Sequence, residues 1–84
     1  MTMHHRPLKE IAAEIQRDWK QVGPAARRYL DELHKLDVPG ERFHADSGIA
    51  VVIYFLASAR LWHGPAARRI KLELREIVRI YPVT

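Results

Sequence analysis

The 84-residue sequence contains no cysteine, which excludes disulfide bridges and thiolate metal sites. Its longest uncharged apolar run, residues 49–59, is much shorter than the roughly 20 residues of a membrane-spanning helix. The N-terminal segment has no apolar core of the signal-peptide kind, and four scattered glycines do not form a glycine-rich phosphate loop. These absences predict a cytoplasmic protein that does not enter a membrane and has no cofactor and no small-molecule substrate.

Composition points to one globular domain spanning residues 1–84, because 48% of the side chains are hydrophobic and 29% are charged. The net charge of +4 is unevenly distributed. Residues 1–46 carry equal numbers of basic and acidic side chains, whereas residues 47–84 carry six Lys and Arg against only Glu73 and Glu76. The basic excess therefore lies in the second half of the chain, where a partner of opposite charge would be attracted.

The spacing of apolar residues predicts four helices, over residues 7–20, 24–36, 49–62 and 65–81. Three of them show a single apolar face. The third has almost no polar side, and its β-branched residues also fit a buried strand. Its length and the lack of partner strands favour a buried central helix.

The segments that flank these helices carry fewer signals. Asp46 and Ser47 are expected to cap the third helix, and Phe43 is expected to anchor the preceding loop in the core. Residues 1–6 and 82–84 are expected to be flexible.

The hexapeptide Gly-Pro-Ala-Ala-Arg-Arg occurs twice, at residues 23–28 and 64–69. Each copy follows a tryptophan, Trp19 or Trp62, and each places a proline where the first turn of a helix tolerates it. The chain therefore reads as two helical hairpins in a compact all-α bundle. Internal duplication and chance repetition of a short alanine- and arginine-rich segment both explain the repeat.

This layout resembles a group of small, uncharacterised, all-helical bacterial and phage proteins of the mobile-element type. The resemblance covers most of residues 11–74. The positions that carry it are Ile11-Ala12-Ala13-Glu14-Ile15, Asp18-Trp19-Lys20, Tyr29-Leu30, Val52-Ile53-Tyr54-Phe55-Leu56, Ala59, Trp62, Gly64, Ala67-Arg68, Ile70-Lys71 and Glu73-Leu74. It implies a bacterial, phage or mobile-element setting, and it implies no chemistry.

Candidate catalytic and metal-binding residues are few. The five histidines include no pair spaced to hold a metal on one helix. Ser47 is better explained as a helix cap and Ser58 lies inside the apolar helix, so neither has the features of a nucleophile. The two tryptophans are expected to pack in the core rather than to stack on bases. The sequence therefore predicts no enzyme activity and no metal site.

The most informative feature is a row of basic residues on the fourth predicted helix. The row consists of Arg68, Lys71, Arg75 and Arg79, whose spacing brings like charges close together. Leu72 lies inside this basic face, away from the buried stripe, as a candidate exposed apolar contact. These five residues are the predicted surface for a partner or a nucleic acid.

An opposite row, Glu10, Glu14 and Asp18, lies on the first predicted helix. Helical geometry places the two rows on flanks that do not meet inside an up-and-down bundle, but that would meet between parallel helices or between two chains. The acidic row is therefore a candidate complementary face. A second interpretation leaves both rows solvated and unpaired.

Two functional hypotheses follow. The first is a non-enzymatic helical module, of the accessory kind found in phages and mobile elements, that binds a protein partner or a second copy of itself as a homodimer. The alternative is a small basic nucleic-acid-binding protein with the outline of a helix-turn-helix, in which the basic row contacts phosphates and Leu72 contacts a base.

Overall fold

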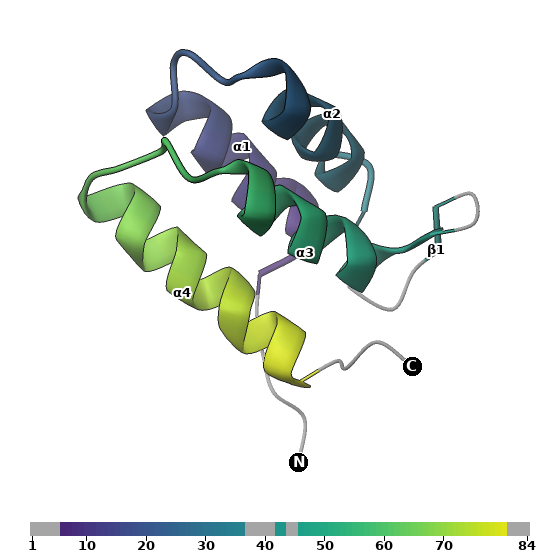
Figure 1. The fold of residues 1–84 in the computed structure, drawn as a ribbon. Helices are drawn as coiled ribbons and strands as arrows, with labels where there is room; N and C mark the ends of the chain where they lie inside the picture. Colours follow the sequence, from purple (N-terminus) through teal and green to yellow (C-terminus); the bar gives the residue numbers. More distant parts are fainter. Residues whose placement is uncertain (1–5, 37–41, 44–45, 81–84) are drawn as a thin grey trace.

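The computed structural model describes residues 6–36, 42–43 and 46–80, whose arrangement is shown in Figure 1. The elements, in order, are α1 (Leu8–Asp18), α2 (Pro24–Leu33), the strands β1 (Arg42–Phe43) and β2 (Asp46–Ser47), α3 (Gly48–Ser58) and α4 (Pro65–Ile80). The two strands pair antiparallel as a short ribbon between α2 and α3. None of the described helices is long and apolar enough to span a membrane.

The four helices form two hairpins that pack on each other. α1 packs against α2 and α4, and α3 packs against the same two helices (Figure 1). The amide of Lys9 at the start of α1 donates to the carbonyl of Leu36, beyond the end of α2, at 2.8 Å. The expected fold class, an all-α protein of four helices in two hairpins, is confirmed, while internal duplication stays a prediction.

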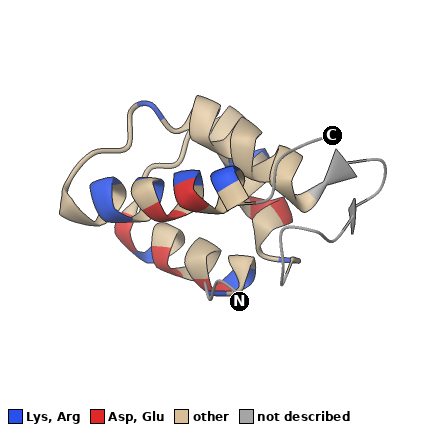
Figure 2. Ribbon diagram, turned by 90° about the horizontal axis from the view of Figure 1, so that it is seen from below, with Lys and Arg blue, Asp and Glu red and all other residues tan. Residues whose placement is uncertain are grey.

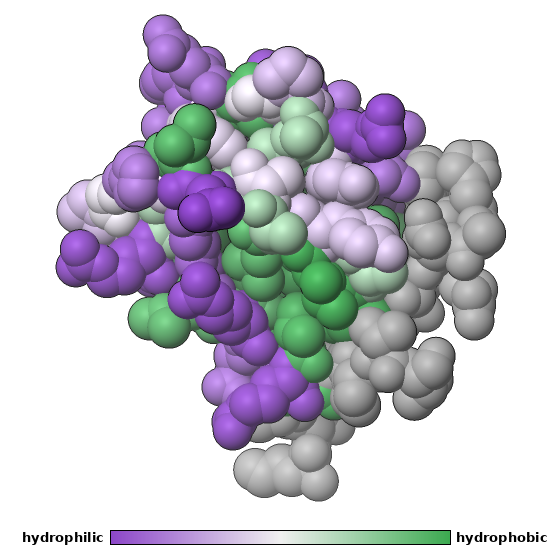
Figure 3. Space-filling model, in the orientation of Figure 1, coloured by the Kyte–Doolittle hydropathy of each residue, from purple (hydrophilic) through white to green (hydrophobic). Residues whose placement is uncertain are grey.

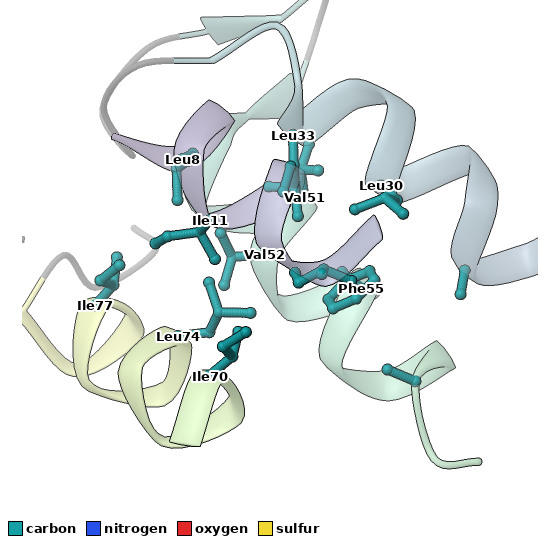
Figure 4. Packing of buried hydrophobic residues seen from close by; sticks show 14 of the residues in the cluster. Leu8, Ile11, Leu30, Leu33, Val51, Val52, Phe55, Ile70, Leu74 and Ile77 are labelled. Carbon is teal, nitrogen blue, oxygen red and sulfur yellow. The ribbon is translucent and has the colours of Figure 1, made fainter. Parts of the chain in front are cut away.

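One cluster of buried hydrophobic side chains joins all four helices. Each helix contributes one apolar stripe, and the stripes of α1 and α4 meet those of α2 and α3 in the centre (Figure 4). The largest side chains without solvent contact are Phe55, Leu8, Ile11, Ile15, Leu30, Leu33, Leu36, Ile70, Leu74, Ile77, Val51 and Val52. The apolar spacing of the sequence therefore locates most of the core.

The two tryptophans pack against each other. Their rings are stacked with centroids 5.7 Å apart, and Phe55 meets both rings edge-on at 6.4 Å. Trp62 is only 2% exposed, and Trp19 is partly buried beside it. Core packing is confirmed for Trp62, and Trp19 packs against the core beside it.

α3 ends earlier than the sequence predicts. Its last residue is Ser58, whose hydroxyl donates to the carbonyls of Tyr54 and Phe55 at 3.0 and 2.9 Å. A serine hydroxyl that binds carbonyls of the preceding turn competes with the backbone for these acceptors. The chain then turns, and this turn brings Trp62 back onto the core.

The expectation that α3 is buried on all sides is wrong. Phe55 has no exposed surface and Leu56 is partly buried, but Ile53 and Tyr54 are 37% and 47% exposed. α3 packs mainly between α2 and α4, so one side of its apolar circumference faces solvent within the described part of the chain.

Both Gly-Pro corners begin a helix in the same way. The Gly23 carbonyl accepts a hydrogen bond of 2.9 Å from the backbone amide of Arg27, four residues later. The Gly64 carbonyl accepts the equivalent bond from the amide of Arg68, also at 2.9 Å. Gly23 has φ −69°, which any residue adopts, whereas Gly64 has φ +110°, which favours glycine. Only the second corner therefore requires its glycine.

Some of the expectations from the sequence concern residues or side chains that lie outside the described part of the structure. The side chains of Phe43, Asp46 and Ser47 are not described, although the backbone of these residues forms the two strands. Residues 1–5 and 81–84 also lie outside the described ranges. Arg6, at the edge of the segment expected to be flexible, is described and makes ion pairs.

Candidate functional site

The two flanks of α4 have opposite electrostatic surroundings. Charged residues of α4 and α1 lie in neighbouring rows when the molecule is seen from below (Figure 2). On the flank toward α1, Arg6 binds Glu73 through two hydrogen bonds of 3.0 and 2.7 Å. Arg6 also pairs with Glu14 of α1 at 2.8 Å, and Glu14 accepts a hydrogen bond from Arg69. These four residues, Arg6, Glu14, Arg69 and Glu73, form the α1–α4 ion network.

The α1–α4 ion network shifts the pKa values of Glu14 and Arg6 in the direction of their charged forms. Hydrogen bonds from Arg69 and then from Arg6 hold the pKa of Glu14 below its ordinary value. The bond to Glu73 is the largest cause that raises the pKa of Arg6. Because every member has an opposite charge beside it inside the chain, the network holds α1 on α4 and leaves little charge for a partner.

The predicted acidic row is largely engaged inside the chain. Glu14 belongs to the α1–α4 ion network, and Asp18 accepts a hydrogen bond from Trp62 Nε1 at 2.8 Å. Glu10 is exposed in the first turn of α1. Two of the three acidic residues therefore make bonds within their own fold, although Asp18 is also exposed to solvent.

On the other flank of α4, three cations lack an acidic partner within the described residues. Arg68 and Arg75 are exposed and make no ion pair there. The Lys71 ammonium donates to the carbonyl of Trp62 at 2.7 Å and lies 5.8 Å from the centre of its ring. Burial and then the nearby charge of Arg75 lower the pKa of Lys71. This flank therefore carries a positive charge that the described residues do not neutralise.

An open groove of about 490 Å³ lies along this flank. Its walls come from the corner before α4 and from the first half of α4, and its lining residues are Trp62, His63, Gly64, Ala67, Arg68, Lys71, Leu72 and Arg75. Leu72 is 60% exposed. We call this feature the α4 groove. It combines cations with apolar surface and has no carboxylate or hydroxyl among its lining side chains.

The structure brings four of the five predicted contact residues together. Arg68, Lys71, Leu72 and Arg75 all line the α4 groove. Arg79 does not line it, and its guanidinium binds Glu76 one turn earlier at 2.8 Å. The predicted acidic row has no ion pair with these residues in the described part of the chain, as the helical geometry of the two rows leads one to expect.

Sequence reasoning missed a second exposed surface, on α3. Leu61 is 83% exposed just after α3, and it continues the exposed side formed by Ile53, Tyr54 and Ala57. In Figure 3 a hydrophobic band runs beside a hydrophilic column that follows α4. The signal was available in the sequence, because a helix without a polar side in a domain of this size has too few neighbours to cover its whole circumference.

The chemistry of the α4 groove is set by its lining side chains. His63 is the single imidazole among them, beside cations and apolar groups, and no hydroxyl, thiol or carboxylate side chain lines the groove. The described residues contain no group of three or more His, Cys, Asp or Glu placed to hold a metal ion. No family model, no curated protein and no solved structure matches this chain.

Proposed function

We propose that the chain is a non-enzymatic helical binding module whose α4 groove binds an acidic segment of a partner protein. One observation carries the proposal. Arg68, Lys71 and Arg75 line one groove without an acidic partner in the described chain, whereas Arg69 on the opposite flank is paired. The groove therefore has an attraction for negative charge that the fold itself does not use.

The apolar part of the groove favours a protein over a simple anion. Leu72 stands between the cations with more than half of its surface exposed. An apolar side chain of a partner that covers Leu72 lowers the free energy of the complex by burying apolar surface. Phosphate groups alone do not provide this contact. Combined apolar and charged contacts are typical of protein interfaces, with charge setting association rate and specificity.

Self-association through the two charged rows has less support. Of the acidic row, a second copy has Glu10 exposed for contact with the basic row, but Glu14 and Asp18 already bind Arg69, Arg6 and Trp62 within the chain. Releasing them would cost the intramolecular bonds that hold α1 on α4. A different protein that brings its own acidic residues avoids this cost.

Nucleic-acid binding is the second candidate, because Arg68, Lys71, Arg75 and Arg79 follow one side of α4 after a tight corner. In its favour, Arg68 and Arg75 are exposed and free of ion pairs within the described residues. Against it, Lys71 binds a backbone carbonyl and Arg79 binds Glu76, so few cations remain for phosphates. The resemblance to small bacterial and phage proteins stays a prediction, and it would give either function an accessory role.

Fluorescence anisotropy with two labelled probes tests the proposal. One probe is a short peptide in which Glu and Asp flank a leucine, and the other is a random-sequence DNA duplex, each measured between about 50 and 200 mM salt. We expect the peptide to bind more tightly than the duplex, and Arg68→Ala and Leu72→Ala to weaken peptide binding. Arg27→Ala, the equivalent arginine of the first hexapeptide, is the matched control and should leave the affinity unchanged. Tighter binding of the duplex, with a salt slope that falls by about one on Arg75→Ala, would favour nucleic acid instead.

A further inference from the structure

The uncovered side of α3 carries exposed apolar residues. Ile53, Tyr54 and Ala57 are exposed on α3, with Ala57 three and four residues after the other two, and Leu61 is exposed in the turn that follows the helix. No charged residue occurs between Gly48 and Ser58. We call these four residues the α3 stripe. Large side chains alternate with the small Ala57, which provides both projections and a recess for an apposed helix.

The α3 stripe borders the α4 groove. Leu61 directly precedes Trp62, which lines the groove and accepts the bond from Lys71 through its carbonyl. Figure 3 shows the hydrophobic band over α3 and the hydrophilic column over α4 side by side on one face of the molecule. The two features therefore make one continuous surface, apolar along α3 and basic along α4.

This surface has unlike borders. On the α4 side lie Arg68, Lys71 and Arg75. On the α2 side Tyr54 packs against Tyr29 with ring centroids 5.5 Å apart, so that border is formed by an aromatic pair. A segment that covers the stripe therefore meets cations along one of its sides and aromatic rings along the other.

We infer that the acidic segment bound by this protein is an amphipathic helix, which lays its apolar face on the α3 stripe and its acidic flank along Arg68, Lys71 and Arg75. The inference rests on the proposed function and specifies the partner. On α3 itself, Ala57 follows Tyr54 and Ile53 at the i+3 and i+4 spacings of one helix side, and an apposed amphipathic helix presents apolar residues at the same spacings, whereas an extended segment does not. In helix-in-groove complexes of this type, apolar side chains at helical spacing are the residues that anchor the bound helix.

Charge argues against a second copy of the chain as the occupant. An identical stripe carries no charge and so contributes no attraction to the cations of the α4 groove. Each copy would bring its own Arg68, Lys71 and Arg75, while Glu14 and Asp18 stay bonded within their own chain. Cations covered without a counter-charge are costly, so a helix that brings acidic residues fits this surface better.

Three designed peptides of about 18 residues, roughly 27 Å long as helices, test the inference. The first has leucines at helical spacing and glutamates along one flank. The second has lysines in place of the glutamates, and the third keeps the composition of the first with the order of residues scrambled. We expect the first peptide to bind at least about tenfold more tightly than the third and to gain helical circular dichroism on binding, and the second not to bind.

Variants of the protein identify which surface is used. Leu61→Ser and Ile53→Ser should each lower the affinity for the first peptide by several-fold and leave the affinity for the scrambled acidic peptide unchanged. Arg75→Ala should lower the affinity for both peptides. Leu61 is 83% exposed, so its replacement should leave the melting temperature unchanged, and Arg27→Ala serves as a control on the other hairpin.

Each contrary outcome has a distinct meaning. Equal affinity for the ordered and scrambled acidic peptides would overturn the helical partner while the proposed function stands. Failure of both acidic peptides to bind would overturn the proposed function and the inference with it. A chain that is dimeric by analytical ultracentrifugation and becomes monomeric on Leu61→Ser would show that a second copy covers the α3 stripe, and would overturn the inference alone.

Discussion

The two Gly-Pro-Ala-Ala-Arg-Arg segments, residues 23–28 and 64–69, have the same local fold, but their arginines make different contacts. Both begin a helix at their proline. In both, the backbone amide of the first arginine donates the same hydrogen bond to the glycine carbonyl. In the second copy Arg69 pairs with Glu14, and its neighbour Arg68 lines the α4 groove. All four arginines are exposed, but Arg27 and Arg28 of the first copy make no ion pair within the described residues.

This difference follows from what each helix packs against. α4 lies beside α1, whose Glu14 faces it, so one arginine of the pair finds a carboxylate and the other does not. Six identical residues therefore determine a local helix start but do not determine what the arginines bind. Comparing equivalent positions in the two hairpins is a direct way to separate local from tertiary effects.

The largest expected effect is one that the two copies share. Leu33 and Leu74 occupy equivalent positions after the hexapeptides, and neither has exposed surface. We expect Leu33→Ala and Leu74→Ala each to lower the free energy of unfolding by about 2–5 kcal/mol, because each leaves a cavity in the common core. Chemical denaturation measures the loss. Leu72→Ala, on the exposed face of α4, should change stability by less than about 0.5 kcal/mol, and a cost as large as that of Leu74→Ala would mean that Leu72 is buried.

The next effect separates the corners. Gly64→Ala should destabilise by about 1–3 kcal/mol, because a side chain disfavours φ +110°, although the space around this glycine is open. Gly23→Ala should be neutral or stabilising by up to about 1 kcal/mol, since alanine adopts its φ of −69° and restricts the unfolded chain. Thermal denaturation of both variants tests the contrast, and His63→Ala should cost less than Gly64→Val. Equal tolerance at the two glycines would contradict the difference in backbone geometry.

A smaller effect separates Arg69 from Arg28. Arg69→Ala should cost at most about 1 kcal/mol near neutral pH, because its pair with Glu14 is partly exposed, and Arg28→Ala should cost less. The pKa of Glu14 lies below its ordinary 4.5 in the folded state, so its stabilisation is complete above about that pH and is lost as the pH falls through the folded-state value.

Denaturation curves recorded from neutral to acidic pH measure this linkage. Arg69→Ala should make the loss of stability below about pH 4.5 less steep. Arg28→Ala should show the same dependence of stability on pH as the unmodified chain. Identical profiles for the two variants would mean that the pair with Glu14 does not contribute.

The smallest expected effect concerns like charges in the α4 groove. Arg75→Ala removes a positive neighbour of Lys71, so the pKa of Lys71 should rise toward its ordinary value. Stability should change by only a few tenths of a kcal/mol, since both groups are near solvent. Nuclear magnetic resonance titration of the lysine side chain follows the shift, with Arg27→Ala as the control. An unchanged pKa of Lys71 would mean that the charge of Arg75 does not act on it.

The sequence allowed much of the fold to be predicted. Apolar spacing located α1, α2 and α4 to within a few residues, because their polar and apolar sides are distinct. It failed on α3, whose end and whose exposed side depend on neighbours. Ser58 and the turn after it end the helix four residues early, and the helix expected to be buried leaves Ile53 and Tyr54 exposed.

The candidate site divides in the same way. The basic residues and Leu72 were found from their positions on one helix face, which depends only on helical geometry. The groove that joins Trp62 and His63 to them, the bond of Lys71 to the Trp62 carbonyl, and the adjoining α3 stripe require the corner to fold back on α4. The internal use of Glu14 and Asp18 was not predicted, because it depends on α1 lying beside α4 and Trp62.

By itself, the sequence determined the number of helices, their apolar faces and the basic row, because each follows from the order of residues along a helix of fixed geometry. The tertiary structure decided which charges are neutralised and which apolar side is left uncovered. Ion pairs and burial depend on distances between residues far apart in the chain, such as Arg6 and Glu73, and only packing sets those distances.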